Sequence, residues 1–303
     1  MKTSDKNISG LVIVNKEQGI TSQGVVSRVK RIFGAAKAGH TGTLDPMATG
    51  VLPVLVGRAV KASEFMLTSV KHYGATLLLG VTTDTEDVTG NVLTTSSDLV
   101  SETDVMRVIG DFTGEIMQTP PMYSALKVGG RKLCDIARSG EVIYREPRPI
   151  TVYSLTAEKI SDSEYYLDVV CSKGTYIRTL CADIGAALGV GGTMKTLTRL
   201  SASGYTLDDA HTLGELEAMS DAERMSALLP VEDVFLKYSC VVLPDFFAKL
   251  AHSGLEIYTK KIGAELNCGD IVRICDKDGF FAVGEVREYP DGLAIKPIRK
   301  FGD

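Results

Sequence analysis

Apolar residues recur along the N-terminal part of the chain in patterns that predict a strand followed by a helix. The short apolar run LVIV (11–14) indicates a buried strand, and a glycine turn follows it. In QGVVSRVKRIFG (23–34), Val and Ile recur at helical spacing, and Gly34 suits a C-terminal stop. We therefore expect a helix that Thr21 or Ser22 caps, with three basic residues on its polar face.

Three later segments continue this alternation of strands and helices. HYGATLLLGV (72–81) is typical of a strand, and the acidic, turn-rich TTDTEDVTGNV follows it. SETDVMRVIGDFTG (101–114) has a Ser or Thr cap, an early acid and apolar residues near a 3.6-residue period, which predicts a capped helix. YYLDVVCSKGTYIRTLCADIGAALG (165–189) begins as a strand, turns at Gly174 and continues as an apolar helix.

Beyond Pro230 the pattern changes to short β-like runs separated by turns. CGDIVRICDKDGFFAVGEVREYPDGLAIKPI (268–298) alternates such runs with Asp-Gly and Pro-Asp-Gly signals. A chain of 303 residues exceeds the usual size of one domain. We therefore expect two domains, residues 1–232 and a small β-rich module of residues 233–303.

Composition indicates an ordinary globular protein. Hydrophobic residues make up 44% of the chain and charged residues 23%. The six cysteines form no C-x-x-C pair, which favours a reducing compartment, and LVIV is too short for a membrane span. The four histidines are scattered, and no metal-binding H-E-x-x-H or phosphate-binding G-x-x-x-x-G-K-[ST] motif occurs. We expect a cytoplasmic protein without metal or cofactor.

Charge is distributed unevenly along the chain. The net charge of −5 by itself argues against a nucleic-acid partner, but residues 20–63 hold six Lys or Arg and a single acid, Asp45. Residues 82–104 hold six acids and no base, and residues 205–240 hold eight acids and two bases. The acidic segments therefore set the overall sign, and the N-terminal part is locally basic.

Asp45 lies within GHTGTLDPMATGVLPV (39–54), a candidate active-site segment. Three glycines permit tight backbone turns, and the proline after Asp45 biases it away from helical conformation. A constrained loop therefore displays one carboxylate. An Asp-Pro pair by itself in such a loop is commonly a turn. The whole 39–54 segment, and not the Asp-Pro pair, therefore has to distinguish a turn from a functional loop.

The 39–54 segment resembles the signature of the TruB family of tRNA pseudouridine synthases. Companion motifs follow in order, and the resemblance covers residues 14–205: KHYGATLLLG (71–80), PPMYSALK (120–127), CSKGTYIRTL (171–180) and LTRLSASGY near residue 200. The resemblance implies an α/β (α+β) pseudouridine synthase core with a mixed, largely antiparallel sheet, and a small C-terminal β-barrel-like module of PUA type. It also implies a target, the uridine at position 55 in the T-arm of tRNA. We further expect a monomer, although the sequence itself does not determine the oligomeric state.

The resemblance assigns roles to five residues. Asp45 matches the essential aspartate that starts exchange of the uridine N1 link for a C5 link, and Arg178 matches the cation that keeps it ionised. Tyr73 matches the aromatic that stacks on the flipped base, Tyr176 a second aromatic of the site, and Leu200 a hydrophobic residue that lines the pocket.

RNA binding is expected from basic groups outside the pocket. His40 matches a residue that contacts RNA near the flipped nucleotide, while Arg58 and Lys61 are suited to phosphate contacts. An insertion at about residues 127–150, rich in Lys and Arg, resembles the RNA-gripping element of the family. Its candidate contacts are Lys127, Arg131 and Lys132.

Two other functions compete with this interpretation. Ser124 and Lys127 stand at the S-x-x-K spacing of penicillin-recognising hydrolases, but the companion S-D-N and K-T-G elements are missing. A non-catalytic RNA-binding protein would gain nothing from an acid among phosphate-contacting groups, because that acid repels RNA. Asp45 therefore favours an enzyme.

Overall fold

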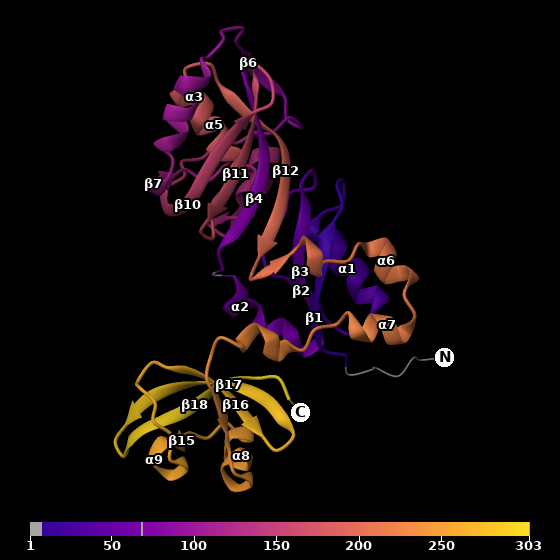
Figure 1. Ribbon diagram of the computed structural model, residues 1–303, viewed down its shortest axis with the longest axis vertical. Helices are drawn as coiled ribbons and strands as arrows, with labels where there is room; N and C mark the ends of the chain where they lie inside the picture. The colour runs from indigo at the N-terminus through magenta and orange to yellow at the C-terminus, as the bar shows by residue number, and fades with distance from the viewer. Residues whose placement is uncertain (1–7, 68, 303) are drawn as a thin grey trace.

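The computed structural model describes residues 8–67 and 69–302, which form two large β-sheets with helices packed against them and two short hairpins (Figure 1). The larger sheet has nine strands. Its main path runs in the order β1 (Gly10–Lys16), β3 (Thr49–Val56), β12 (Gly192–Ala202), β4 (Lys71–Leu79), β11 (Glu164–Cys171), β10 (Arg148–Lys159) and β7 (Gly114–Gln118). Two short strands, β2 (Ala38–His40) and β13 (Tyr205–Thr206), pair with β3 and β12.

Strand direction in this sheet agrees with the expected fold class. β12 runs parallel to β3, and the other strand pairs of the sheet within the described residues are antiparallel. Two short hairpins, β5 (Val81–Thr83) with β6 (Val92–Thr95) and β8 (Lys127–Val128) with β9 (Arg131–Lys132), lie outside it. The expected α/β architecture with a mixed, largely antiparallel sheet is confirmed.

The local helix signals are confirmed near their expected residues. In α1 (Ser22–Ile32), the Thr21 side chain accepts a hydrogen bond from the amide of Gly24, as an N-cap does. In α3 (Glu102–Gly110), Ser101 caps the helix by accepting from the amide of Asp104. Helix α5 (Ile177–Ala187) follows β11 through a loop that contains Gly174.

The main core lies between the nine-stranded sheet and its helices. Apolar residues of β4, β11 and β10 pack with α3 and α5, and residues of β1 and β3 pack with α1 and α6 (Leu213–Ala218). On β4 the buried members of this core are Tyr73, Ala75, Leu77 and Leu79, which alternate along the strand and so share one face. Tyr73 lies at the end of this row.

The C-terminal part contains a curled five-stranded sheet and two helices. The strand order is β14 (Cys240–Val242), β16 (Ile271–Asp276), β17 (Gly279–Tyr289), β18 (Gly292–Lys300) and β15 (Ile257–Tyr258). The hairpins expected from the Asp-Gly signals are present. Helices α8 (Asp245–His252) and α9 (Thr259–Ile262), which the strand pattern did not predict, cover this sheet at the lower end of Figure 1.

An aromatic contact joins the two sheets. Phe235, from the 3₁₀ helix η3 (Val231–Phe235), is fully buried against Leu11 and Ile13 of β1 and against Val283 and Phe301 of the C-terminal part. Its ring centroid lies 5.2 Å from that of Phe301. The segment around residue 232, where we expected a domain boundary, is thus also a packing centre.

The pair of strands β3 and β12 is held close by a glycine. Gly50 has φ +103°, and a Cβ there would lie 2.2 Å from the carbonyl oxygen of Arg199. We expect Gly50→Ala to lower the free energy of unfolding by about 3 kcal/mol, because it adds overpacking to backbone strain.

A matched control separates strain from overpacking. Gly19 has φ +89° with no atom within 4 Å of its Cβ position, so Gly19→Ala should cost roughly 1 kcal/mol. Urea unfolding of both variants measures the difference. Equal losses of unfolding free energy in the two variants would show that the close approach of β12 adds nothing to the cost of Gly50→Ala.

Candidate active site

A cavity of about 650 Å³ opens where the loop between β2 and β3 meets the start of α5. This volume is within the range of small-molecule sites and suits one nucleotide. The wall combines segments that are far apart in sequence: residues 41–45, 67, 71, 73, 118, 120, 123–126, 148–150, 173–178, 197 and 199. All five segments that carry the resemblance therefore meet at one cavity.

The loop that carries Asp45 is fixed from two sides. Ser22, the first residue of α1, bonds both the amide (2.8 Å) and the carbonyl oxygen (2.9 Å) of Leu44. Lys16, at the end of β1, is fully buried, and its ammonium donates to the carbonyl oxygens of Pro46 and Ala48. The residues on both sides of Asp45 are thus held by α1 and β1.

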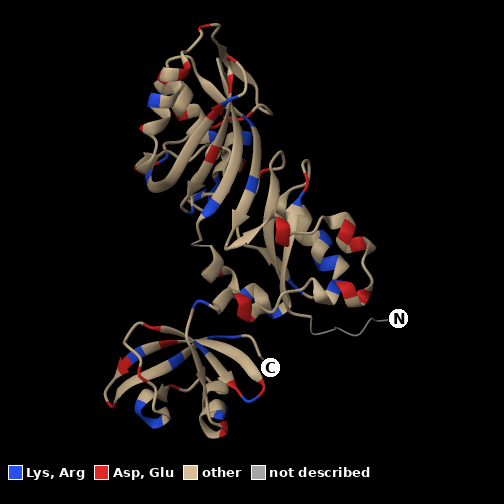
Figure 2. Cartoon of the chain, in the orientation of Figure 1, with Lys and Arg blue, Asp and Glu red and all other residues tan. Residues whose placement is uncertain are grey.

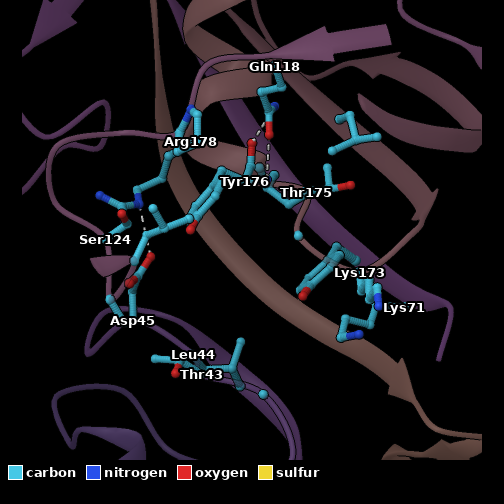
Figure 3. Close-up of a pocket in the computed structure, with 18 of the residues that line it drawn as sticks. Thr43, Leu44, Asp45, Lys71, Gln118, Ser124, Lys173, Thr175, Tyr176 and Arg178 are labelled. Carbon is cyan, nitrogen blue, oxygen red and sulfur yellow. Dashed lines mark hydrogen bonds and ion pairs between the residues drawn. The ribbon is translucent and has the colours of Figure 1, made fainter. Parts of the chain in front are cut away.

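Asp45 forms an ion pair with Arg178 inside the cavity (Figure 3). Arg178 Nε lies 2.9 Å from Asp45 Oδ2, and Arg178 Nη1 lies 3.6 Å from the carboxylate of Asp87. The guanidinium also donates to the carbonyl oxygens of Thr85 and Tyr123, each at 2.8 Å. Four contacts therefore fix the Arg178 guanidinium, which is almost fully buried, on the side of Asp45.

Burial raises the pKa of Asp45 above its ordinary value of 3.8. Arg178 and Lys16 lower that pKa and the nearby Asp87 carboxylate raises it, but desolvation is the largest effect. We expected Arg178 to hold the pKa down, and its contribution has that direction. The net shift is upward because the side chain is two-thirds buried in a cleft with a second acid beside it.

Two tyrosines line the cavity. Tyr73 is 7% exposed, and burial raises the pKa of its hydroxyl group. Tyr176 is the N-cap residue of α5, and the Gln118 side chain brackets its backbone: the amide of Tyr176 donates to Oε1 (2.8 Å) and its carbonyl accepts from Nε2 (3.0 Å). Gln118, which we did not single out from the sequence, therefore positions Tyr176.

The structure does not place Leu200 in the cavity wall, where we expected it. Leu197 and Arg199 line the cavity, and Leu200 does not. The reason is strand geometry: the register of β12 against β4 shifts between Arg199 and Ser201, so Leu200 falls in an irregularity of the ladder. Leu197 lies two residues before Arg199 and shares its face.

The basic residues expected to bind RNA are dispersed around the cavity. His40 is half-buried outside it, and its Nδ1 accepts from the Gly42 amide at 3.3 Å. Burial lowers the pKa of His40, with Arg199 adding to the effect. Lys61 donates to the carbonyl oxygen of Lys300 in β18, and Arg58 lies in the same 3₁₀ helix, η1 (Gly57–Ala62).

Part of the basic N-terminal stretch is neutralised within the fold. Arg28 lies 2.9 Å and Arg31 3.3 Å from the Glu217 carboxylate of α6. Figure 2 shows basic residues of α1 beside acidic residues of α6 and α7 (Asp221–Ser226). A basic segment and an acidic segment of the chain thus pair with each other, which reduces the positive charge that α1 presents to a partner.

The insertion at residues 127–150 presents its basic groups to solvent. Lys127, Arg131 and Lys132 are exposed on the β8–β9 hairpin, and helix α4 (Leu133–Arg138) follows. Leu133 and Ile136 of α4 pack with Met122 in a small cluster of their own. The insertion ends in β10, which begins at Arg148.

Ser124 and Lys127 do not form a nucleophile and base pair. Ser124 is buried, and its Oγ bonds to none of the described residues, whereas Lys127 is exposed on β8. The Ser-Lys hydrolase interpretation is therefore not supported by the geometry.

Several residues in or beside the cavity were missed because their roles depend on distant neighbours. Asp87 belongs to the acidic segment that we interpreted as a turn-rich connection, yet it is 4% exposed and accepts hydrogen bonds from the Thr85 and Thr89 side chains. Lys71 and Arg199 lie inside the quoted motifs. Their alternation with Tyr73 and Leu197 was a signal that they face the same side.

Two possible features are absent from residues 8–67 and 69–302. No group of three or more His, Cys, Asp or Glu is arranged to hold a metal ion. Across the same residues, every helix is too short or too polar to cross a membrane.

The sequence matches two family models. Residues 30–177 match the TruB family pseudouridylate synthase N-terminal domain, and residues 178–235 match the tRNA pseudouridylate synthase B C-terminal domain. The first contains Asp45 and Tyr73, and the second begins at Arg178.

Similar proteins carry related names. A tRNA pseudouridine synthase B from Methylobacillus flagellatus is 40% identical over 94% of this chain and 93% of its own length. One from Dechloromonas aromatica is 45% identical over 76% of this chain and 77% of its own. Among solved structures, a chain of a Cbf5-Nop10-Gar1 complex superposes with a TM-score of 0.71 at 27% identity, covering 96% of this chain and 84% of that one.

Proposed function

This chain belongs to the TruB family of pseudouridylate synthases, and from that membership we propose that Asp45 is its catalytic carboxylate and that its target is uridine 55 in the T-loop of tRNA. The observation that carries the proposal is the Asp45–Arg178 ion pair inside a cavity of nucleotide size. The relatives are named for action on tRNA. The isomerisation of uridine to pseudouridine is the reaction for which the family is named.

The reaction is an isomerisation in which no group is gained or lost overall. The bond between N1 of uracil and C1′ of the ribose breaks, and a bond between C5 and C1′ forms. The proton on C5 leaves to solvent, and N1 ends protonated. One ionised carboxylate near the sugar and base can start this exchange, and Asp45 is the acid that lines the cavity.

The Arg178 guanidinium has two tasks in this proposal. It favours the ionised form of Asp45, against the burial that favours the neutral acid. It also holds the carboxylate in one orientation, because its own position is fixed by the Asp87 carboxylate and two backbone carbonyls. A carboxylate oriented in advance costs no reorganisation when the substrate arrives.

The two tyrosines offer surfaces for a base that has left the RNA stack. Tyr73 lies on the sheet and Tyr176 on the opposite loop, and both line the cavity. Flipping a nucleotide costs a few kcal/mol, which stacking and backbone contacts offset. We assign Tyr73 to stacking on the uracil ring.

RNA contacts outside the cavity are assigned to the exposed β8–β9 hairpin. Its Lys127, Arg131 and Lys132 are exposed, and the hairpin follows directly after the cavity-lining residues 123–126 in the chain. The α1 arginines are poorer candidates than the sequence indicated, because they pair with Glu217. His40, Arg58 and Lys61 remain proposed contacts at the periphery.

The proposal extends to organisation and location. Residues 1–232 form the catalytic domain and residues 233–303 a PUA-like module, which is supported by a separate core around Ile274 and Ile295. We propose a monomer, because one chain supplies the whole wall of the cavity. Six free cysteines are consistent with a cytoplasmic location.

Tritium release tests the function and its target together. A tRNA transcript with tritium at uridine C5 should release label on incubation with the protein, because the C5 proton is lost. A transcript with cytidine at position 55 should lose that release, and one with cytidine at position 54 should keep most of it. Release that is unaffected by cytidine at position 55 would reject the target, and no release from any folded transcript would reject the activity.

A further inference from the structure

The cavity has a second charged wall, on the side away from the Asp45–Arg178 pair. Lys71 projects from β4, Arg199 from β12, and Lys173 from the loop after β11, and all three line the cavity. Figure 3 shows Lys71 and Lys173 together, across the cavity from Asp45 and Arg178. Strand register explains this proximity, since Lys71 pairs with Cys171 and Arg199 pairs with Tyr73.

Lys71 is an unusual residue for this position because it is 9% exposed and, among residues 8–67 and 69–302, has no acidic partner. Its ammonium donates to the carbonyl oxygen of Ser69 at 2.9 Å. Within the part of the chain that the structure describes, no carboxylate forms an ion pair with Lys71, Arg199 or Lys173. An ammonium has three donors, so two of them are available to a ligand.

Electrostatics make this wall costly in the free protein. Burial lowers the pKa of Lys71, and the charges of Arg199 and Lys173 lower it further. Like charges held together in a partly buried wall oppose folding unless an anion joins them. Arg199 cannot move away, because its guanidinium donates to the carbonyl oxygens of Val51 and Gly42.

A nucleotide within RNA has a charge pattern that complements the two walls. Its uracil ring is neutral, and the phosphodiesters on either side of it each carry one negative charge. Asp45 repels a phosphate, and the cationic wall attracts one. The cavity therefore distinguishes the two ends of the nucleotide by charge.

We propose that Lys71, supported by Arg199 and Lys173, binds one of the two phosphodiesters that flank the flipped uridine and so sets how deep the nucleotide enters relative to Asp45. This inference rests on the proposed function, since it takes an RNA uridine as the occupant. The contact places the sugar between the cationic wall and the carboxylate. Lys71 is thus a positioning residue for the isomerisation.

Chemical removal of a single phosphate charge tests this contact. T-arm stem–loops are made with one neutral methylphosphonate linkage, on the 5′ side or the 3′ side of the target uridine, and compared with the unmodified stem–loop. Each RNA is assayed with the unaltered protein, Lys71→Met and Lys71→Arg. Dissociation constants and single-turnover rates of pseudouridine formation are measured.

We expect Lys71→Met to weaken binding or slow the reaction about 10- to 100-fold on unmodified RNA, the effect of losing a charge-assisted hydrogen bond. One of the two methylphosphonates should cost the unaltered protein a similar factor. On that RNA, Lys71→Met should cost nothing further. Lys71→Arg should recover part of the loss, and the salt dependence of binding should fall by about one counterion in Lys71→Met.

Lys195→Met is the matched control. Lys195 lies on β12, is exposed, pairs with Glu164 and does not line the cavity. We expect this variant to respond to each methylphosphonate as the unaltered protein does.

Other outcomes would overturn the inference. If Lys71→Met costs the same factor on all three RNAs, its partner is a uracil carbonyl or the Ser69 loop and not a phosphate. Full activity of Lys71→Met would also reject it. The methylphosphonate responses of the unaltered protein remain informative even if a variant folds poorly, and pseudouridine formation on unmodified RNA shows separately whether the proposed function holds.

Discussion

Asp45→Asn is expected to reduce pseudouridine formation by at least about 10⁴-fold, because an amide can neither carry the negative charge nor act as a nucleophile. Asn has nearly the same shape as Asp and keeps the loop that Ser22 and Lys16 hold. Single-turnover tritium release from uridine C5 measures the rate. The dissociation constant for tRNA should change little, since an acid contributes no attraction to phosphate.

The same substitution has a predicted effect on stability. A raised pKa means that the folded protein disfavours the charged form of Asp45, so this group's contribution to stability is lost as pH rises through that pKa. Asp45→Asn should therefore be at least as stable as the unaltered protein at neutral pH. Its advantage should vanish below the ordinary pKa of 3.8, where the acid is neutral in both states.

Asp98→Asn is the control for Asp45→Asn, because Asp98 is an exposed acid outside the cavity. It should leave rate and stability unchanged. The catalytic assignment of Asp45 fails if Asp45→Asn keeps its rate within tenfold of the unaltered protein while Asp98→Asn behaves normally.

Arg178→Met is expected to have the second largest effect, on both rate and stability. It leaves the carboxylates of Asp45 and Asp87 near each other without a cation, and removing one partner from a buried pair costs about 3–5 kcal/mol. The rate should fall about 10²- to 10³-fold, the effect of a lost preorganised charge. Denaturant unfolding and single-turnover rates measure the two losses.

A pH profile distinguishes a catalytic role of Arg178 from a structural one. Arg178 lowers the pKa of Asp45, so its removal should raise that pKa further. The rate loss of Arg178→Met should shrink as pH rises, because Asp45 ionises again. A loss that is equal at every pH would show that Arg178 acts by orienting the carboxylate or by stabilising the fold, and not by lowering the pKa of Asp45.

Two companion variants complete the test of Arg178. Adding Asp87→Asn to Arg178→Met removes one of the two opposed acids and should restore part of the stability but little of the rate. Arg28→Met breaks an exposed pair with Glu217 and should cost no more than about 1 kcal/mol. A large loss in Arg28→Met would indicate that general charge balance, and not the buried site, explains the effect of Arg178.

The local structure was predictable where a few adjacent residues decide it. Thr21 and Ser101 cap their helices as expected, because a cap needs only its own hydroxyl and an amide three residues ahead. The Asp-Gly turns of the C-terminal sheet are of the same kind. Helices α8 and α9 were missed because they are short and lie among strands whose pattern is stronger.

Long motifs also identified the residues that meet at the cavity. Asp45, Tyr73, Tyr176 and Arg178 come from three of them, and all four line the cavity. Leu200 shows the limit of such matching. Leu197 and Leu200 lie in the same motif, LTRLSASGY, and the motif alone does not say which of them faces the cavity. A shift of register in β12 decides that Leu197 lines the cavity.

The sequence by itself determined the family, the alternating elements and the presence of one acid in a basic N-terminal stretch. Only the tertiary structure decided how charges pair, since attraction between charges depends on distance through space and on burial. It placed Asp87 beside Arg178 and Glu217 beside Arg28, and it left Lys71 buried without an acidic partner in the described part of the chain. The net pKa shift of Asp45 was decided in the same way, because the water excluded by the folded chain outweighs the cation that the motif supplies.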